Sequence, residues 1–202
     1  MNYSMVLYIL GYILKFESAF LMLPALVSLI YQEEAGIPFV ITAAICLALG
    51  IVLTHKKPSS STVYTREGFV TVALSWIVMS IFGALPFVWN GDIPYYVDAL
   101  FETVSGFTTT GSSILSDVES LSHASLFWRS FSHWIGGMGV FVFIMSILPL
   151  MGGSTINLMK AESPGPSVSR LVPHIKDTAK ILYGIYLAIT LLEIVILCAL
   201  GM

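Results

Sequence analysis

Phe101-Glu102-Thr103-Val104-Ser105-Gly106-Phe107-Thr108-Thr109-Thr110-Gly111-Ser112-Ser113 is the stretch that decides how the rest of this chain is interpreted. A short apolar segment, Asp98–Phe107, runs into Thr108–Ser113, which has no bulky apolar side chain and no charge. Lipid cannot hydrogen-bond a backbone, so irregular backbone at membrane depth is tolerated only inside protein or beside a wet cavity. The stretch therefore predicts a re-entrant pore loop whose carbonyls replace the hydration shell of a cation. The alternative is a Thr/Ser-rich extracellular turn after an amphipathic helix.

The composition of the whole chain is that of an integral membrane protein. Hydrophobic residues make up 56% of it, charged residues 10%, and the mean hydropathy is +0.88. A soluble domain carries about 25% charged residues. Cys46 and Cys198 both fall in apolar spans, which indicates small buried side chains and neither a disulfide nor a zinc site. The first apolar run is too long for a signal peptide and is expected to remain as a membrane anchor.

Five segments are long enough to cross a membrane, because a span needs about 20 apolar residues. They are Met5–Ile30, Ile37–Leu53, Gly68–Trp89, Ser125–Leu150 and Ile181–Met202. Asp98–Phe107 reaches only about 15 Å as a helix, half of the hydrocarbon core, so it can enter the membrane but cannot cross it. The predicted fold class is an all-α membrane protein with five transmembrane helices plus one re-entrant pore helix and filter loop.

The basic residues orient these spans. The linkers after the second and fourth spans hold seven of them, whereas the other two connections hold only acids. Basic linkers belong in the cytoplasm, which places the N-terminus inside and makes the pore loop enter from the outer face. The seven residues are Lys56, Lys57, Arg66, Lys160, Arg170, Lys176 and Lys180.

The candidate filter follows the pore helix, with K⁺ expected at the carbonyls of Thr109 and Thr110. A helix that ends in mid-membrane points the negative end of its dipole and its last unpaired carbonyls at the centre, which favours a cation. Gly111 permits the positive φ that turns successive carbonyls to one side. An acidic outer vestibule of Asp92, Asp117 and Glu119 is expected to concentrate cations. The filter residues are Thr109, Thr110, Gly111 and Ser112.

Arg129 and His133 share one face of the helix that follows the loop. Arg129 is expected either to pair with Glu102 and support the filter from behind, or to snorkel to the outer interface. A second pair of intramembrane charges, Lys15 and Glu17, are two residues apart and cannot face each other, which favours a structural role for each.

Three glycines follow Arg129 and His133 in the sequence. They permit either close helix packing, the more frequent reason for such glycines, or a helix bend beside the conduction path. They are Gly136, Gly137 and Gly139.

Three motifs together resemble the TrkH branch of the Trk/Ktr/HKT potassium transporters, and the resemblance covers nearly the whole chain. They are Phe101–Ser113, Phe127–Gly139 (FWRSFSHWIGGMG) and Met159–Pro166 (MKAESPGP). In that family an accessory helix pair precedes four repeats of helix, pore loop and helix, and the four loops converge on one K⁺ pathway.

The resemblance implies the following domain organisation. Residues 1–54 form the accessory transmembrane helix pair, and residues 68–150 form the first helix–pore loop–helix repeat. Residues 55–67 and 151–180 are cytoplasmic linkers, and residues 181–202 are the first helix of an incomplete second repeat. Since one loop supplies a quarter of the carbonyl ring that K⁺ requires, the chain is expected to be the N-terminal part of a transporter subunit.

The implied function is potassium uptake across the plasma membrane of a bacterial or archaeal cell, with K⁺ as the transported ion and no covalently bound cofactor. The implied partners are a cytoplasmic TrkA-type nucleotide-binding regulatory subunit and a second copy in a homodimer of the full-length form. No nucleic acid is expected to bind.

Two alternatives are a non-conducting membrane scaffold and an intramembrane serine hydrolase that uses Ser130 or Ser132 with His133. The hydrolase is disfavoured because residues one or three apart on a helix diverge, whereas a nucleophile and its base must meet. The chain is therefore not expected to be an enzyme.

Overall fold

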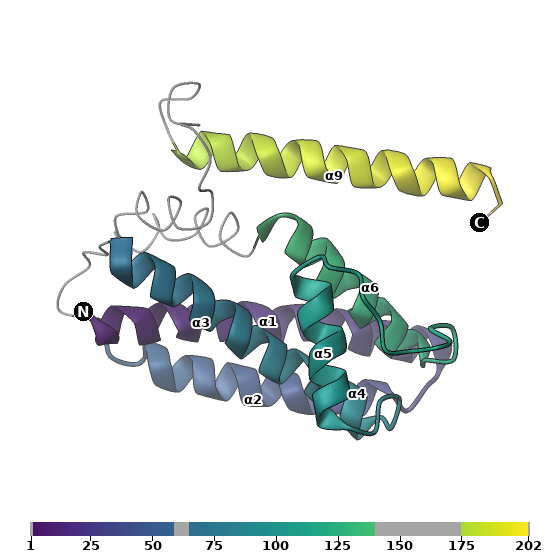
Figure 1. Cartoon of the computed structure of the whole chain (residues 1–202), viewed down its shortest axis with the longest axis horizontal. Coiled ribbons are helices and arrows are strands. Elements are labelled where there is room, and N and C mark those ends of the chain that lie inside the picture. The colour runs from purple at the N-terminus through teal and green to yellow at the C-terminus, as the bar shows by residue number, and fades with distance from the viewer. Residues whose placement is uncertain (1, 59–64, 140–174, 202) are drawn as a thin grey trace.

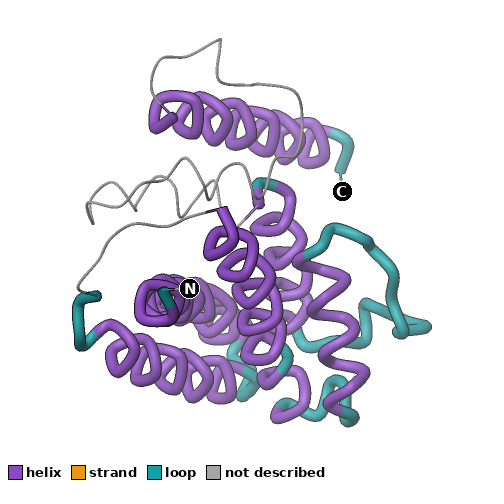
Figure 2. The backbone as a smooth tube through the Cα atoms, turned by 60° about the vertical axis from the view of Figure 1, so that its left-hand side comes forward, coloured by secondary structure: helices purple, strands orange, loops and turns teal. Residues whose placement is uncertain are grey.

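The computed structural model describes residues 2–58, 65–139 and 175–201, and every regular element in those ranges is an α-helix (Figure 1, Figure 2). Four helical stretches in the described ranges are long and apolar enough to cross a membrane: Tyr3–Tyr31, Gly36–Thr54, Glu67–Trp89 and Ile181–Ala199. These findings confirm the all-α membrane fold class. The predicted span Ser125–Leu150 lies partly outside the described residues. The helices are α1 Tyr3–Tyr31, α2 Gly36–Thr54, α3 Thr65–Gly83, α4 Leu85–Trp89, α5 Tyr96–Phe107, α6 His123–Gly137 and α9 Ile175–Ala199.

The central helix is α1, which packs against α2, α3 and α6 (Figure 1). It forms an antiparallel hairpin with α2, and the turn begins where Gln32 caps α1 with a left-handed φ of +57°. Two glycines meet where the hairpin helices touch. A Cβ on Gly50 would lie 2.7 Å from the carbonyl oxygen of Gly11, so the small residues set how closely these backbones approach.

The two charged residues inside α1 have different surroundings. Lys15 Nζ donates to Thr54 Oγ1 on α2 at 2.6 Å and lies 4.9 Å from the centre of the Tyr12 ring. The Glu17 side chain is fully buried, and within the described ranges neither of its oxygens has a hydrogen-bond partner. Lys15 therefore joins the two helices of the hairpin, whereas Glu17 is buried with its polar atoms unsatisfied.

Trp128 of α6 fixes the position of α5 against α2 and α3. Its side chain is fully buried, and Nε1 donates to the Gly83 carbonyl at the end of α3 at 2.9 Å. The rings of Phe39 from α2 and Phe107 from α5 pack edge-on against it at 6.4 Å and 6.2 Å. Such aromatic pairs add about 0.5–1.5 kcal/mol each beyond their buried area. One side chain thus joins α2, α3, α5 and α6.

The last described helix, α9, lies apart from the others (Figure 1, Figure 2). No residue of its apolar span Ile181–Ala199 is buried. It contacts α6 through two hydrogen bonds: Tyr186 Oη donates to the Trp134 carbonyl, and Trp134 Nε1 donates to Thr190 Oγ1, both at 3.1 Å.

Candidate functional site

The helix α5 spans Tyr96–Phe107, two residues longer at its start than Asp98–Phe107, and measures about 18 Å. It ends in a Schellman motif, in which the chain turns through a left-handed residue. Thr109 has a φ of +55°, and its N–H donates to the Gly106 carbonyl at 2.9 Å. The N–H of Thr110 donates to the Ser105 carbonyl at 3.0 Å, which completes the pattern.

This ending corrects two sequence expectations. Thr108–Ser113 was expected to be extended and non-helical. It is non-helical, but Thr108 and Thr109 belong to the turn that ends α5, so the extended part begins at Thr110. The last carbonyls of α5 were also expected to be unpaired, whereas those of residues 104–106 all accept hydrogen bonds from residues 108–110. The physical reason is that a helix end satisfies its orphan carbonyls by bending the chain back over them.

Gly111 has a φ of +74°, the left-handed conformation that the sequence predicted for it. A Cβ at this position would meet no atom within 4 Å. Thr108–Ser113 is exposed throughout in the part of the chain that the structure describes. A side chain at position 111 is therefore disfavoured by backbone conformation and not by crowding.

The extended segment is tied to α5 and α6 by one buried carboxylate. Glu102 is 1% exposed, and its Oε1 accepts from Arg129 Nε of α6 at 2.6 Å. The Ser113 hydroxyl lies 3.0 and 3.1 Å from the two Glu102 oxygens, and the Ile114 N–H donates to Oε2 at 3.2 Å. We call Glu102, Ser113, Ile114 and Arg129 the Glu102 cluster. Arg129 thus pairs with Glu102, the first of the two arrangements expected for it.

Sequence reasoning missed Ser113 and Ile114 as partners of Glu102. Ser113 was quoted as part of the loop, but no spacing rule links a helical carboxylate to a hydroxyl 11 residues later. The only signal was the buried carboxylate itself, because a carboxylate with several lone pairs is rarely satisfied by a single arginine.

The three glycines at the end of α6 have separate surroundings. A Cβ on Gly136 would clash with the Phe107 carbonyl, and one on Gly137 would clash with the Tyr186 hydroxyl. Gly136 and Gly137 thus permit close packing, against α5 and α9 respectively. Gly139 has a φ of +66° just beyond the last residue of α6. The predicted helix bend depends on residues after 139, which lie outside the described ranges.

The serine and histidine side chains of α6 form no Ser–His hydrogen bond within the described ranges. Ser132 Oγ donates to the Arg129 carbonyl at 2.7 Å, and His133 Nδ1 contacts the same carbonyl at 2.8 Å. Ser130 is exposed. The hydrolase alternative therefore gains no support from this geometry.

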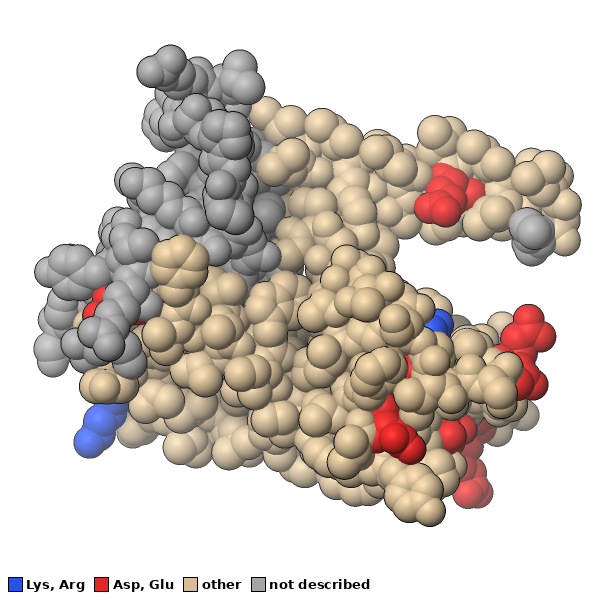
Figure 3. Space-filling view, viewed as in Figure 1, with Lys and Arg blue, Asp and Glu red and all other residues tan. Residues whose placement is uncertain are grey.

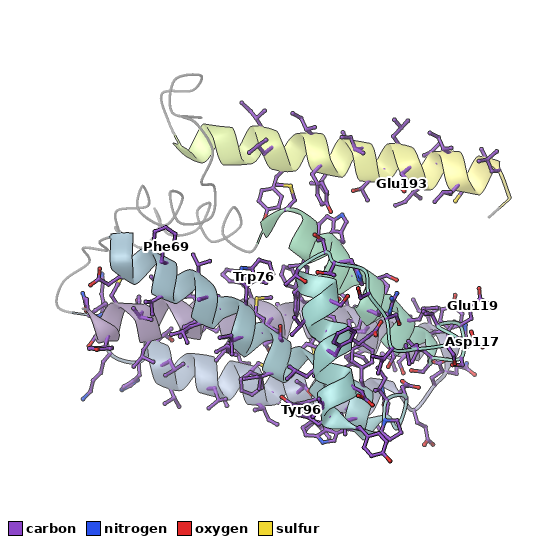
Figure 4. The ribbon with its side chains drawn as sticks, in the orientation of Figure 1. Phe69, Trp76, Tyr96, Asp117, Glu119 and Glu193 are labelled. Carbon is purple, nitrogen blue, oxygen red and sulfur yellow. The ribbon has the colours of Figure 1, made fainter. Side chains whose placement is uncertain are left out.

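Acidic side chains gather at one end of the molecule, where the loops α1–α2, α4–α5 and α5–α6 meet; we call it the acidic end (Figure 3). Figure 4 labels Asp117 and Glu119 there. The Asp92 carboxylate accepts hydrogen bonds from the Ser122 hydroxyl and N–H, at 2.7 and 3.3 Å. Asp92 thereby ties the loop before α5 to the start of α6.

Glu33 joins the α1–α2 turn to the start of α6 at this end. Its Oε1 accepts from the His123 N–H and contacts His123 Nδ1, and the His123 ring stacks on Tyr31 at 4.0 Å. Burial raises the pKa of the Glu33 carboxyl, but the hydrogen bonds from His123 and from the Ala124 N–H outweigh it, so the pKa lies below its ordinary value.

Comparisons with known proteins agree on one family. A family model described as TrkH, cation transport protein, matches residues 35–200. The Trk system potassium uptake protein TrkH of Salmonella typhimurium is 38% identical over 205 residues, which cover 100% of this chain and 41% of that protein. The Trk system potassium uptake protein TrkG of Escherichia coli K12 is 37% identical over 180 residues, which cover 87% of this chain and 37% of that protein.

A solved structure agrees with these sequence matches. The crystal structure of the potassium transporter TrkH from Vibrio parahaemolyticus superposes with a TM-score of 0.73 at 34% sequence identity, covering 95% of this chain and 38% of that one. The chain spans about two fifths of the length of the curated relatives it matches. With a family model over most of its length and 38% identity to relatives that align with all of it, the chain belongs to the TrkH family of cation transport proteins.

Proposed function

We propose that this chain contributes one pore loop to a potassium uptake protein. The observation that carries the proposal is the loop itself: a short helix ends in a turn, and Gly111 follows in a left-handed conformation within an exposed polar segment. Such an exposed, non-helical segment leaves backbone carbonyls available to a cation, as a filter requires. The relatives named as potassium uptake proteins support K⁺ as the ion.

The filter carbonyls are those of Thr109, Thr110, Gly111 and Ser112, with K⁺ at Thr109 and Thr110. Glu102 and Arg129 support the filter from behind, since the Glu102 cluster holds the loop where it leaves the filter residues. A dehydrated K⁺ needs carbonyls from several sides, so further pore loops complete the pathway. The chain then acts as the N-terminal part of a longer transporter and not as an enzyme.

The distribution of charge supports a plasma membrane location with the N-terminus in the cytoplasm. Lys56 and Lys57 follow α2 at the end of the helical hairpin opposite to the acidic end. Basic residues favour the cytoplasmic side, which leaves the acidic end outside. The cytoplasmic side is then the docking face for a TrkA-type nucleotide-binding regulatory subunit, and the full-length form is a homodimer. No nucleic acid takes part.

The test uses Gly111→Ser in a full-length transporter that contains this segment, expressed in cells deficient in K⁺ uptake. A Cβ at φ +74° disfavours the native carbonyl orientation, so the uptake ratio of ⁸⁶Rb⁺ to ²²Na⁺ is expected to fall about tenfold, which corresponds to about 1.4 kcal/mol. The matched control is Gly91→Ser, because Gly91 also has a positive φ of +78° and open space around it but lies before α5.

A selective loss in the Gly111 variant alone supports the filter assignment. An unchanged Rb⁺/Na⁺ ratio in that variant, with normal membrane insertion, would contradict it. The scaffold alternative predicts that no variant of this segment alters the selectivity of cation uptake.

A further inference from the structure

Two threonine hydroxyls meet at the end of the loop that adjoins α5. Thr108 Oγ1 and Thr110 Oγ1 lie 2.8 Å apart, and either atom of this pair has the geometry to be the donor. Thr108 Oγ1 also lies 2.8 Å from the Val104 carbonyl oxygen, which accepts a hydrogen bond and cannot donate one. A hydroxyl has a single proton, so the Thr108 proton points to Val104 and the Thr110 proton points to Thr108.

This assignment leaves acceptor capacity on the exposed side of the pair. Thr110 Oγ1 keeps both lone pairs and Thr108 Oγ1 keeps one, because a hydroxyl oxygen has two. Thr110 Oγ1 has no second hydrogen-bond partner within the described ranges, and both side chains are exposed there. The two oxygens therefore face outward from α5 as acceptors only.

The third hydroxyl of the run is arranged differently. Thr109 Oγ1 donates to the Thr108 carbonyl at 2.7 Å, within the turn that carries the φ of +55°. Its side chain belongs to the turn itself. Thr110 is the first residue of the extended part. Its hydroxyl proton points to Thr108 Oγ1, and its lone pairs are on the exposed side of the pair.

We propose that the Thr110 hydroxyl oxygen, oriented by Thr108, is a direct ligand of a dehydrated monovalent cation at the start of the filter. This inference rests on the proposed function and adds a side-chain ligand to the backbone carbonyls. A neutral oxygen with free lone pairs replaces one water of a weakly hydrated cation. An anion requires donors, and both hydroxyl protons of the pair are already used.

The test measures the concentration dependence of ⁸⁶Rb⁺ uptake by the full-length transporter in K⁺-uptake-deficient cells. Thr110→Val keeps the shape but removes the ligand, so the half-saturating Rb⁺ concentration is expected to rise about tenfold, equal to about 1.4 kcal/mol. Thr110→Ser keeps the hydroxyl and is expected to match the parent within about threefold. Thr108→Val removes the acceptor that orients the Thr110 proton, together with the hydrogen bond to the Val104 carbonyl, and is expected to fall between them.

Thr42→Val is the control for the loss of a threonine hydroxyl that donates to a helical carbonyl. Thr42 Oγ1 donates to the Pro38 carbonyl four residues earlier in α2, as Thr108 does to Val104, but in the accessory hairpin. Its uptake curve is expected to be unchanged. Surface expression of every variant is measured alongside, so that a loss of protein is separated from a loss of affinity.

A second variant distinguishes a ligand from a structural hydroxyl. Thr110→Cys places a soft sulfur where the hard hydroxyl oxygen was, and soft ligands favour soft cations. The uptake ratio of Tl⁺ to Rb⁺ is expected to rise about fivefold, equal to about 1 kcal/mol. A purely structural role for Thr110 leaves this ratio unchanged.

The outcomes separate the two proposals. If Thr110→Val and Thr110→Cys leave both the Rb⁺ affinity and the Tl⁺/Rb⁺ ratio unchanged while Gly111→Ser loses selectivity, the hydroxyl inference is wrong and the filter assignment stands. If the Gly111 variant is also unchanged, the filter assignment fails with it. A shift in the Thr110 variants that Thr110→Ser restores supports the inference.

Discussion

Gly136 of α6 lies directly against the carbonyl oxygen of Phe107, the last residue of α5. A Cβ at Gly136 would overlap that oxygen and would also come within 3.0 Å of the Gly106 carbonyl oxygen. Both atoms are backbone and belong to the end of α5, just before Thr108. Gly136 thus determines how closely the end of α5 approaches α6.

Gly136→Ala is expected to destabilise the protein, because the new methyl group meets backbone that cannot rotate away. Overpacking of this kind costs about 1–3 kcal/mol. The apparent melting temperature of the purified protein in detergent is the measurement. Gly184→Ala is the control, since a Cβ there meets no atom of the described residues within 4 Å. Equal melting temperatures for the parent and Gly136→Ala would show that α5 and α6 are not held this tightly.

The ion pair within the Glu102 cluster is expected to behave as a unit. Removing one partner by Glu102→Gln or Arg129→Gln leaves the other charge uncompensated, which costs about 3–5 kcal/mol for a fully buried pair. Glu102 is the more buried partner, 1% exposed against 17% for Arg129, so Arg129→Gln, which leaves the carboxylate uncompensated, is expected to cost more than Glu102→Gln. A double-mutant cycle on thermal stability measures the coupling. If the stability losses of the two single variants add up to that of the double variant, the ion pair contributes no coupling energy to stability.

The Glu33–His123 contact is expected to stabilise the acidic end in a pH-dependent way. The pKa of Glu33 lies below its ordinary value of 4.5, so the stabilisation is fully present above that pH and is lost as the pH falls through the lowered pKa. Thermal unfolding of the parent and Glu33→Gln, compared from neutral pH to about pH 3, isolates this component, expected to be at most about 1 kcal/mol. Parallel curves over the whole range would contradict it.

Glu17→Met is expected to leave the protein at least as stable as the parent. The Glu17 carboxyl is fully buried in α1 without a hydrogen-bond partner in the described ranges, and such a group costs about 1–3 kcal/mol. Glu102→Met is the matched comparison, because the Glu102 carboxylate is equally buried but has three hydrogen-bond partners. The Glu102→Met variant is therefore expected to be less stable than the parent. A large loss of stability in Glu17→Met would reveal a partner outside the described residues.

The sequence alone predicted the structural features that depend on hydrophobic periodicity and on single residues. The length of the apolar segment before Thr108 predicted a helix too short to span, and Gly111 has the predicted positive φ. The turn at Thr109 was not predicted, because a β-branched residue in a left-handed conformation runs against local preference. It is held there by two backbone hydrogen bonds to α5, which depend on how the whole loop folds back.

Tertiary contacts of the site were predictable only in part. The pairing of Glu102 with Arg129 was one of two arrangements expected for Arg129, the other being snorkelling to the outer interface, and the structure shows the first. Ser113 and Ile114 both bind the Glu102 carboxylate because of the path that the loop takes. The hydropathy of the sequence does not predict that path. The packing of Gly136 against Phe107 likewise depends on the angle between two helices and not on their sequences alone.

The Glu102 cluster has a consequence for the order in which the protein is built. Its hydrogen bonds connect residues 11, 12 and 27 positions apart, all between Glu102 and Arg129. Contacts so local in sequence form early, because little loop entropy is lost in closing them. The re-entrant loop and its carboxylate can therefore assemble as soon as α6 has left the ribosome. In that order the burial of Glu102 coincides with the arrival of Arg129, and α9 packs afterwards on an α6 that is already joined to the loop.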